Sequence, residues 1–142
     1  MISDQRMKTI EAVEKEIIKE FAHLPDIESK YEYLFELGGD LPEMDPSLKN
    51  KKNLVRGCQS QFWFQLSIED GKLQLQVDSD SLVMKGIGAL MVRLIDDRQP
   101  QEIQNLNLDF IDKLNIWKLP SNRNNGLLSM MSHLHRQAEQ LS

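Results

Sequence analysis

An alternating pattern between residues 62 and 77 constrains the fold more than any other feature of the sequence. Every second side chain on both sides of an Asp70-Gly71 pair is apolar, and these positions are Phe62, Phe64, Leu66, Ile68, Leu73, Leu75 and Val77. Such alternation is typical of strands with one buried face, and Asp-Gly favours a type I′ turn because both central residues need a positive φ. The pattern therefore predicts a β-hairpin whose apolar face is covered by other elements.

The helical spacing of apolar residues predicts three helices before residue 97. The first covers Met7–His23 and stops at Pro25, the second is capped by Asp26 and stops at Gly38-Gly39, and the third is capped by Ser79, Asp80 or Ser81 and ends near Asp96. We expect the first two helices to form an antiparallel pair. Gly86 and Gly88 lie inside the third helix, where each costs about 1 kcal/mol relative to alanine, so another backbone is expected close to them.

The C-terminal part predicts shorter helical pieces and one last helix. The short pieces are expected at Pro100–Ile103 and Leu108–Leu114, and the last helix at Gly126–Leu141, with Ser121 or Asn122 as its cap. Because no internal repeat or second composition class is evident, residues 1–142 are expected to form a single domain. The element order predicts an α+β fold in which helices pack mainly on one face of a small antiparallel sheet.

The charge and hydropathy of the chain exclude several classes of partner. Its 142 residues include 17 Lys and Arg against 22 Asp and Glu, a net charge of −5 at pH 7, so no nucleic acid is expected as a partner. The apolar runs are short, and the polar start of the chain is not followed by an apolar segment. We therefore expect a cytoplasmic protein with no membrane partner.

The chain contains one cysteine and three histidines, which is too few for several kinds of site. One cysteine cannot close an internal disulfide, and this set cannot supply the ligands of a zinc finger or a four-cysteine iron–sulfur cluster, so no metal is expected. Cys58 lies in the polar stretch 56–60, after a long irregular loop over residues 40–57. Two interpretations remain open here: an inert structural thiol, or an exposed thiolate stabilised by nearby cations such as Arg56.

The histidines do not point to an enzyme that uses Cys58 as its nucleophile. A cysteine hydrolase needs a histidine base within hydrogen-bond reach of the thiol. His133 and His135 lie two apart on a helix and point in different directions, and His23 lies at a helix end. We expect each histidine to be exposed or hydrogen-bonded.

Other polar and aromatic residues have less specific interpretations. Asp78 and Asp80 are expected to cap the third helix rather than to act as paired carboxylates. The basic run over residues 49–56 is either a solvated face or a docking surface for an acidic partner. Trp63 lies on the polar face of the hairpin, where we expect it to pack at the core edge or over the loop rather than to remain an exposed interaction residue.

Several motifs resemble those of the SufE family of sulfur acceptors. Val55-Arg56-Gly57-Cys58-Gln59-Ser60-Gln61, followed by Trp63, resembles the cysteine loop of that family. Asp78-Ser79-Asp80, Val83-x-Lys85-Gly86 and Arg123-x-x-Gly126-Leu127 resemble its later blocks, so the resemblance covers about Ile10 to Ala138. The sequence departs from the family pattern at Phe62, at Leu114-Asn115-Ile116 and at Pro120-Ser121-Asn122.

The resemblance implies a fold like that of the scaffold protein IscU and a role as a sulfur carrier. It implies that a SufS-like or CsdA-like cysteine desulfurase passes persulfide sulfur to Cys58, and that the sulfur goes on to a SufBCD-like iron–sulfur scaffold complex. The pyridoxal phosphate cofactor then belongs to the desulfurase, and this chain needs no cofactor of its own. Support for the loop, or the partner interface, is expected from Arg56, Gly57, Gln59, Ser60, Trp63, Asp78, Lys85 and Arg123.

Two alternatives to the carrier remain. The chain is an interaction module that activates a desulfurase without carrying sulfur, or it is an independent hydrolase or redox enzyme. The second alternative is disfavoured because no histidine is placed beside Cys58 and the chain has no resolving cysteine. We therefore expect a partner in sulfur transfer rather than an independent enzyme.

Overall fold

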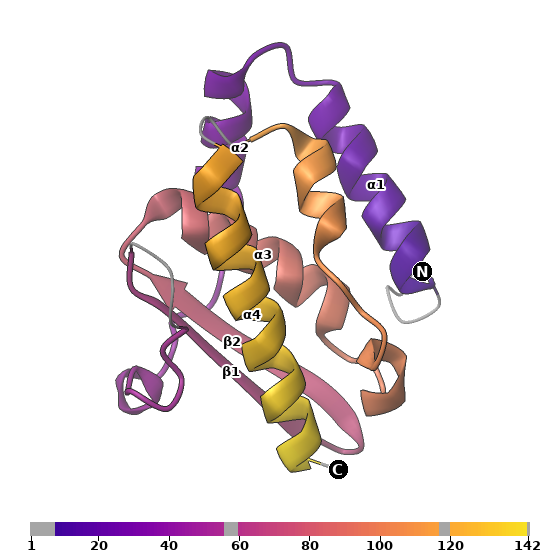
Figure 1. Cartoon of the computed structure of the whole chain (residues 1–142), viewed down its shortest axis with the longest axis vertical. Helices are drawn as coiled ribbons and strands as arrows, with labels where there is room; N and C mark the ends of the chain where they lie inside the picture. Colours follow the sequence, from indigo (N-terminus) through magenta and orange to yellow (C-terminus); the bar gives the residue numbers. More distant parts are fainter. Residues whose placement is uncertain (1–7, 56–59, 117–119, 142) are drawn as a thin grey trace.

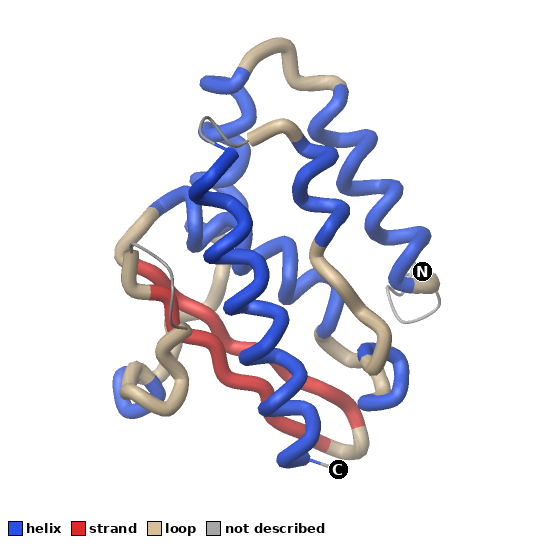
Figure 2. Tube along the Cα trace, in the orientation of Figure 1, coloured by secondary structure: helices blue, strands red, loops and turns tan. Residues whose placement is uncertain are grey.

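The computed structural model describes residues 8–55, 60–116 and 120–141, without the side chains of residues 120–128. The elements are α1 (Ile10–Ala22), α2 (Ile27–Gly39), η2 (Pro46–Leu48), β1 (Phe62–Glu69), β2 (Lys72–Ser79), α3 (Leu82–Ile95), η3 (Pro100–Ile103), η4 (Asp109–Leu114) and α4 (Pro120–Leu141), where η denotes a 3-10 helix. This order confirms the α+β class (Figures 1 and 2). The short helix at Pro100–Ile103 is also confirmed.

The two strands form the predicted hairpin. Phe64 pairs with Val77 in its register, and Leu66 with Leu75, so the apolar residues of both strands share one face. At the turn, Asp70 has a φ of 54° and Gly71 a φ of 78°, the positive values that a type I′ turn requires.

A sheet of only two strands is marginally stable in water. Here neighbouring segments pair with both of its outer edges. At the edge of β2, the Leu73 amide donates to Arg98 O at 2.7 Å, and Leu73 O accepts from the Asp97 amide at 2.8 Å. At the edge of β1, the Phe64 amide donates to Asn53 O at 2.9 Å. The loop that leads toward Cys58 is therefore part of the sheet's own hydrogen bonding.

The helices cover the apolar face of the hairpin, as predicted. α3 contacts β2 and α4 contacts β1, and both meet side chains of the same face: a Cβ at Gly88 of α3 would touch Val77 and Phe62, and His133 of α4 packs against Phe64. Figure 1 shows α1 and α2 on the side of the molecule away from the strands, and α1 contacts α3 and η4. The core lies between the hairpin and these helices.

The main partner of α2 is α3, which corrects the expected antiparallel pairing of the first two helices. Gly86 permits the close contact, because a Cβ at this position would lie 2.7 Å from Leu34 Cβ and against Leu34 O. α1 meets α2 at the rings of Phe21 and Tyr33, whose centroids are 5.2 Å apart. The close approach of another backbone is therefore confirmed at Gly86, whereas the atoms close to Gly88 belong to the side chains of Val77 and Phe62.

The predicted starts of α2 and α3 are confirmed, whereas those of α1 and α4 are corrected. α1 begins at Ile10, capped by Thr9, rather than at Met7. Asp26 caps α2 and Ser81 caps α3, because the side chain of each accepts a hydrogen bond from a backbone amide of the first turn. α4 begins at Pro120 rather than near Gly126, so Ser121 and Asn122 lie inside its first turn and are not its caps. Proline is favoured in the first turn because it lacks the amide that would remain unpaired there.

Candidate functional site

The structure describes the two ends of the segment that contains Cys58. Arg56, Gly57, Cys58 and Gln59 lie outside the described residues, so the roles predicted for them stay predictions. Val55 is the last described residue before the segment and Ser60 the first after it. The geometry of the site is therefore built from the residues that hold these ends.

Backbone hydrogen bonds hold the N-terminal end against the start of β1. The Val55 amide donates to Phe62 O at 2.8 Å, and Leu54 forms an antiparallel bridge with Trp63. Val55 is also buried in the core, with 2% of its surface exposed. The loop therefore reaches Cys58 from a fixed point on the sheet.

The C-terminal end is held by the turn between β2 and α3. Gln61 O accepts from Ser79 Oγ at 2.6 Å and from the Asp80 amide at 3.2 Å, and the Gln61 amide donates to Asp80 Oδ1 at 3.0 Å. Asp80 therefore binds the end of the cysteine segment instead of capping α3 as expected. Ser60, a predicted site residue, is partly exposed beside this contact.

Asp78 binds two lysines from different parts of the chain. Its Oδ2 lies 2.6 Å from Lys49 Nζ, in the loop before the cysteine segment, and its Oδ1 lies 3.7 Å from Lys85 Nζ on α3. The Asp78 side chain is 15% exposed, so these ion pairs are only partly screened by water. Asp78 therefore links the loop, β2 and α3 rather than capping the helix as expected.

The charges around Asp78 keep its carboxyl ionised. Burial of the side chain opposes ionisation, but hydrogen bonds from Lys49 and from the Ser79 amide, with the charges of Lys49 and Lys85, hold the pKa of Asp78 below its usual value. The carboxylate is therefore a fixed anchor for both ammonium groups near neutral pH.

Trp63 covers the loop, as expected from its place on the polar face of the hairpin. It lies directly across from Asp78 in the strand register, and Lys49 Nζ lies 5.6 Å from its ring centroid. Trp63, Asp78 and Lys85 were predicted from the sequence, and the structure brings them together. Lys49 was missed as an individual residue; its signal was the basic run after residue 48.

The structure does not bring Arg123 into this cluster through a described contact. Its backbone lies in the first turns of α4, and its side chain is among those outside the description. The role predicted for Arg123 therefore stays a prediction.

The described histidines have backbone partners. A ring nitrogen of each lies within hydrogen-bond distance of a carbonyl oxygen: His133 with Phe64 at 3.2 Å, His135 with Leu106 at 3.2 Å, and His23 with Lys19 at 2.7 Å. This confirms the expectation that they are satisfied. Within residues 8–55, 60–116 and 120–141, no group of three His, Cys, Asp or Glu side chains is arranged to hold a metal ion.

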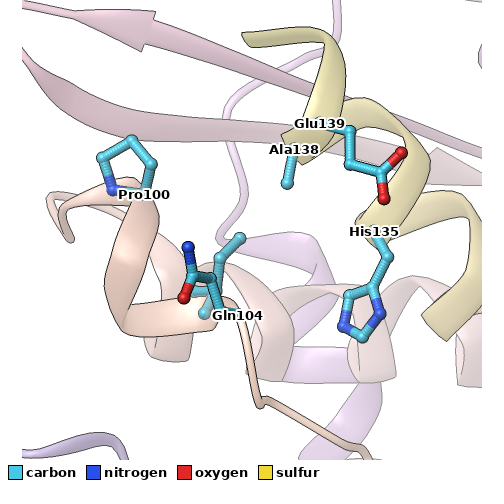
Figure 3. A pocket seen from close by; sticks show the side chains of 6 residues that line it. Pro100, Gln104, His135, Ala138 and Glu139 are labelled. Atoms are coloured by element: carbon cyan, nitrogen blue, oxygen red, sulfur yellow. The ribbon is translucent and has the colours of Figure 1, made fainter. Parts of the chain in front are cut away.

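A separate cavity of about 260 Å³ lies between η3 and α4. Its lining residues are Pro100, Ile103, Gln104, His135, Ala138 and Glu139 (Figure 3). η3 follows Arg98, which pairs with Leu73 next to the hairpin turn, whereas the ends of the cysteine segment pair with the other end of the hairpin. The predicted site residues that the structure describes, Ser60, Trp63, Asp78 and Lys85, do not line this cavity.

The fold and the site define a small α+β protein whose single cysteine lies in a short segment held at both ends against a two-stranded sheet. The chain belongs to the SufE family, because the family model described as SufE, Fe-S metabolism associated domain, matches residues 15–138. Membership of this family supports a role in Fe–S cluster biogenesis.

Two relatives support this placement, and one solved structure shares the fold. The chain is 35% identical over 126 residues to SufE-like protein 1, chloroplastic/mitochondrial, of Arabidopsis thaliana, covering 87% of this chain but 34% of that protein, so it spans about a third of that relative's length. It is 34% identical over 130 residues to an uncharacterized SufE-like protein of Rhizobium meliloti (strain 1021), covering 87% of this chain and 93% of that protein. The solution structure of a hypothetical protein from Thermus thermophilus has the same fold, with a TM-score of 0.73, 21% identity and coverage of 90% of this chain and 94% of that one.

None of the helices in the described part of the chain is both long enough and apolar enough to cross a membrane.

Proposed function

We propose that this chain is a sulfur acceptor and carrier in iron–sulfur cluster assembly. A SufS-like or CsdA-like cysteine desulfurase passes sulfur to Cys58, and the chain delivers it to a SufBCD-like scaffold complex. Because the transfer empties the desulfurase for its next turnover, the chain also stimulates that enzyme. The observation that carries the proposal is the place of the only thiol, between Val55 and Gln61, in a chain of the SufE family.

The transfer is a thiol–disulfide type of exchange that needs no added oxidant or reductant. The Cys58 thiolate attacks the terminal sulfur of the desulfurase persulfide with its electron pair, and an S–S bond forms. The S–S bond of the donor breaks, its electron pair leaves on the desulfurase thiolate, and Cys58 now carries the persulfide. Attack on the inner sulfur would instead give a mixed disulfide between the two proteins and release hydrosulfide.

The outcome of this exchange depends on where the Cys58 sulfur stands relative to the incoming persulfide. The bonds of Val55 and Gln61 limit the movement of the segment ends, and Asp78 holds two ammonium groups beside them. Cationic groups near a thiol favour the thiolate. The proposed supporting or interface residues are Arg56, Gly57, Gln59, Ser60, Trp63, Asp78, Lys85 and Arg123, with Lys49 added from the structure.

The chemistry that releases sulfur from free cysteine belongs to the desulfurase, which holds the pyridoxal phosphate. In this proposal residues 1–142 act as one domain without a cofactor of their own. We place the protein in the cytoplasm, where a reducing environment keeps a lone thiol free of disulfides.

The test is intact-mass spectrometry after incubation with a cysteine desulfurase and free cysteine. The wild-type chain is expected to gain the mass of one sulfur atom, in a form that a reducing agent removes, and Cys58→Ser is expected to gain nothing. A second control moves the thiol by two positions, in Cys58→Ser/Ser60→Cys. This variant keeps one cysteine but is expected to gain little sulfur, because the proposal depends on the place of the thiol.

The same samples separate the carrier from a non-carrying activator when alanine production by the desulfurase is followed. A carrier raises the turnover of the desulfurase only with Cys58 in place. If Cys58→Ser stimulates the bound desulfurase fully and no sulfur is found on the wild type, the carrier proposal is wrong and the activator takes its place.

A further inference from the structure

Gln137 on α4 is a buried amide that completes the edge of β1. It is 8% exposed, and its Oε1 accepts from the Leu66 amide at 2.6 Å while its Nε2 donates to Phe64 O at 3.2 Å. One side chain thus pairs with two successive outward-facing backbone groups of the strand, as a neighbouring strand would do. Gln137 therefore fixes α4 to the strand that follows the cysteine segment.

The same amide also reaches the loop that precedes the cysteine segment. Gln137 Nε2 donates to Asn53 Oδ1 at 3.1 Å, across 84 residues of sequence, and Asn53 is 2% exposed. Asn53 is itself fixed, since its Nδ2 donates to Leu48 O at 2.9 Å and its carbonyl accepts from the Phe64 amide at 2.9 Å. Gln137 therefore contacts the chain on both sides of residues 56–59.

His133 completes this buried group. Its Nε2 lies 2.9 Å from Gln137 Nε2 and 3.2 Å from Phe64 O, and its Nδ1 lies 3.4 Å from Arg136 Nη2. The imidazole of His133 and the amide of Gln137 therefore meet at the same carbonyl of β1.

We propose that Gln137 and Asn53 are positioning residues for Cys58. The proposal rests on the proposed function, because it assigns to these residues the placement of the sulfur-accepting thiol. Their hydrogen bond ties the loop over residues 48–55 to α4, and the Val55 amide extends that fixed geometry to the last described residue before the segment. Without the bond, the loop loses its link to α4 while its backbone pairs with β1 remain, and we expect the Cys58 thiol to react faster.

The test is the rate of alkylation of Cys58 by iodoacetamide in the folded protein, read by intact mass. Because Cys58 is the only cysteine, the modified mass reports on this thiol alone. Gln137→Met keeps the length of the side chain but neither donates to Asn53 nor accepts from Leu66, and Asn53→Ala removes the other partner. Each variant is expected to raise the rate about fivefold to tenfold, as for the loss of one buried hydrogen bond.

The double variant tests whether the two residues act through one contact. If they do, Gln137→Met/Asn53→Ala alkylates within about twofold of either single variant, because the second substitution has no bond left to break. The matched control is Ile17→Val, a core substitution in α1 that lowers the melting temperature without touching this group. Its alkylation rate is expected to equal that of the wild type.

The proposal is overturned if both single variants alkylate no faster than Ile17→Val, or if their effects multiply in the double variant. If Gln137→Met does not fold, Asn53→Ala is tested alone. The proposal then requires that Asn53→Ala raises both the alkylation rate of Cys58 and the rate at which the Val55 amide exchanges with deuterated solvent. No desulfurase is present in these measurements. A failure of sulfur transfer is therefore distinguishable from a failure of the positioning role.

Discussion

The helices α3 and α4 cover the same face of the same hairpin by different means. α3 lies along β2 and α4 along β1, and both are seen against the strands in Figure 1. α3 comes close to its neighbours because Gly86 and Gly88 have no side chains, and we call this the shape-determined contact. α4 is held by hydrogen bonds from the buried side chains of His133 and Gln137, and we call this the polar contact.

On α3, two glycines set the distance to the neighbouring elements. A Cβ at Gly86 would collide with Leu34 of α2, and a Cβ at Gly88 would lie 2.9 Å from Val77 Cγ2 and 3.1 Å from Phe62 Cε1. Close packing of this kind tolerates very little added volume. The atoms that meet at Gly86 and Gly88 belong to no titratable group, so this packing is expected to be independent of pH.

On α4, the corresponding positions are His133 and Gln137. His133 is 3% exposed and packs edge-on against the Phe64 ring with centroids 5.6 Å apart. Such polar contacts are costly when one partner is lost, because the remaining buried group has no water to replace it. They also carry the link to Asn53, so the polar contact is the one that joins the sheet to the loop before Cys58.

The largest effect is expected where the shape-determined contact is overfilled. Gly86→Ala is expected to lower the free energy of unfolding by about 2 to 3 kcal/mol, although alanine is the better helix former, because the new methyl group meets the backbone of α2. Urea unfolding followed by circular dichroism measures this. Gly39→Ala is the control, since no atom lies within 4 Å of its added Cβ, and a change within about 0.5 kcal/mol is expected. Equal stability of the two variants would contradict the packing argument.

The sequence predicts the shape-determined part of the fold well. Alternation and the Asp70-Gly71 pair are sufficient to predict the hairpin, and both glycines of α3 are recognisable as sites of close approach because they are unfavourable inside a helix. The sequence does not indicate which element makes the approach. α2 and α3 therefore pair where α1 and α2 were expected to, because contacts between distant segments leave no local signal.

The polar part was harder to predict for the same reason. Lys49 lies in a run of basic residues that is typical of a solvated face, and its pairing with Asp78 appears only when β2 and the loop are brought together. Gln137 has no feature that separates it from an exposed helix residue, since its partners Asn53 and Leu66 are 84 and 71 residues away. Cys58, in contrast, was singled out by its neighbours in sequence, and its predicted role remains to be tested.

The polar contact of α4 is expected to weaken at acidic pH. Burial, together with the charge of Arg136, lowers the pKa of His133 although the Phe64 carbonyl opposes this. As the pH falls below about 6.5, the unfolded state binds a proton that the folded state does not, so the free energy of unfolding falls until the folded-state pKa is reached. His133→Gln, which keeps a donor for Phe64 O, is expected to remove this loss.

Urea unfolding at a series of pH values between 7.5 and 5 measures the effect. His135→Gln changes the same residue type on the same helix and is expected to keep the wild-type slope. If His133→Gln and the wild type lose stability in parallel, His133 is not the source of the pH dependence, and the polar contact of α4 does not depend on its protonation.

The smallest effect is expected at the end of α3, where one titratable group adjoins the shape-determined contact. Asp96 Oδ1 accepts from the Leu75 amide at 2.8 Å. Burial and the charge of Asp97 raise the pKa of Asp96, although this hydrogen bond opposes the shift. The folded state thus favours the protonated form, and the free energy of unfolding falls as the pH rises from the unfolded pKa of about 3.9 through the folded value.

Asp96→Asn keeps the acceptor for Leu75 and removes the charge, so it is expected to raise the free energy of unfolding by about 0.5 kcal/mol at pH 7, a small value because the carboxyl is partly solvated. The gain should shrink toward pH 3, where the wild-type carboxyl is protonated, and Asp109→Asn, at an exposed carboxylate of η4, should show no gain at either pH. A loss of stability in Asp96→Asn at pH 7 would show that the ionised group is needed at the edge of β2.

The protonation of His133 and that of Asp96 change the free energy of unfolding in opposite directions. Toward acidic pH the contact of α4 therefore weakens while that of α3 does not, and the two contacts are separable by pH alone.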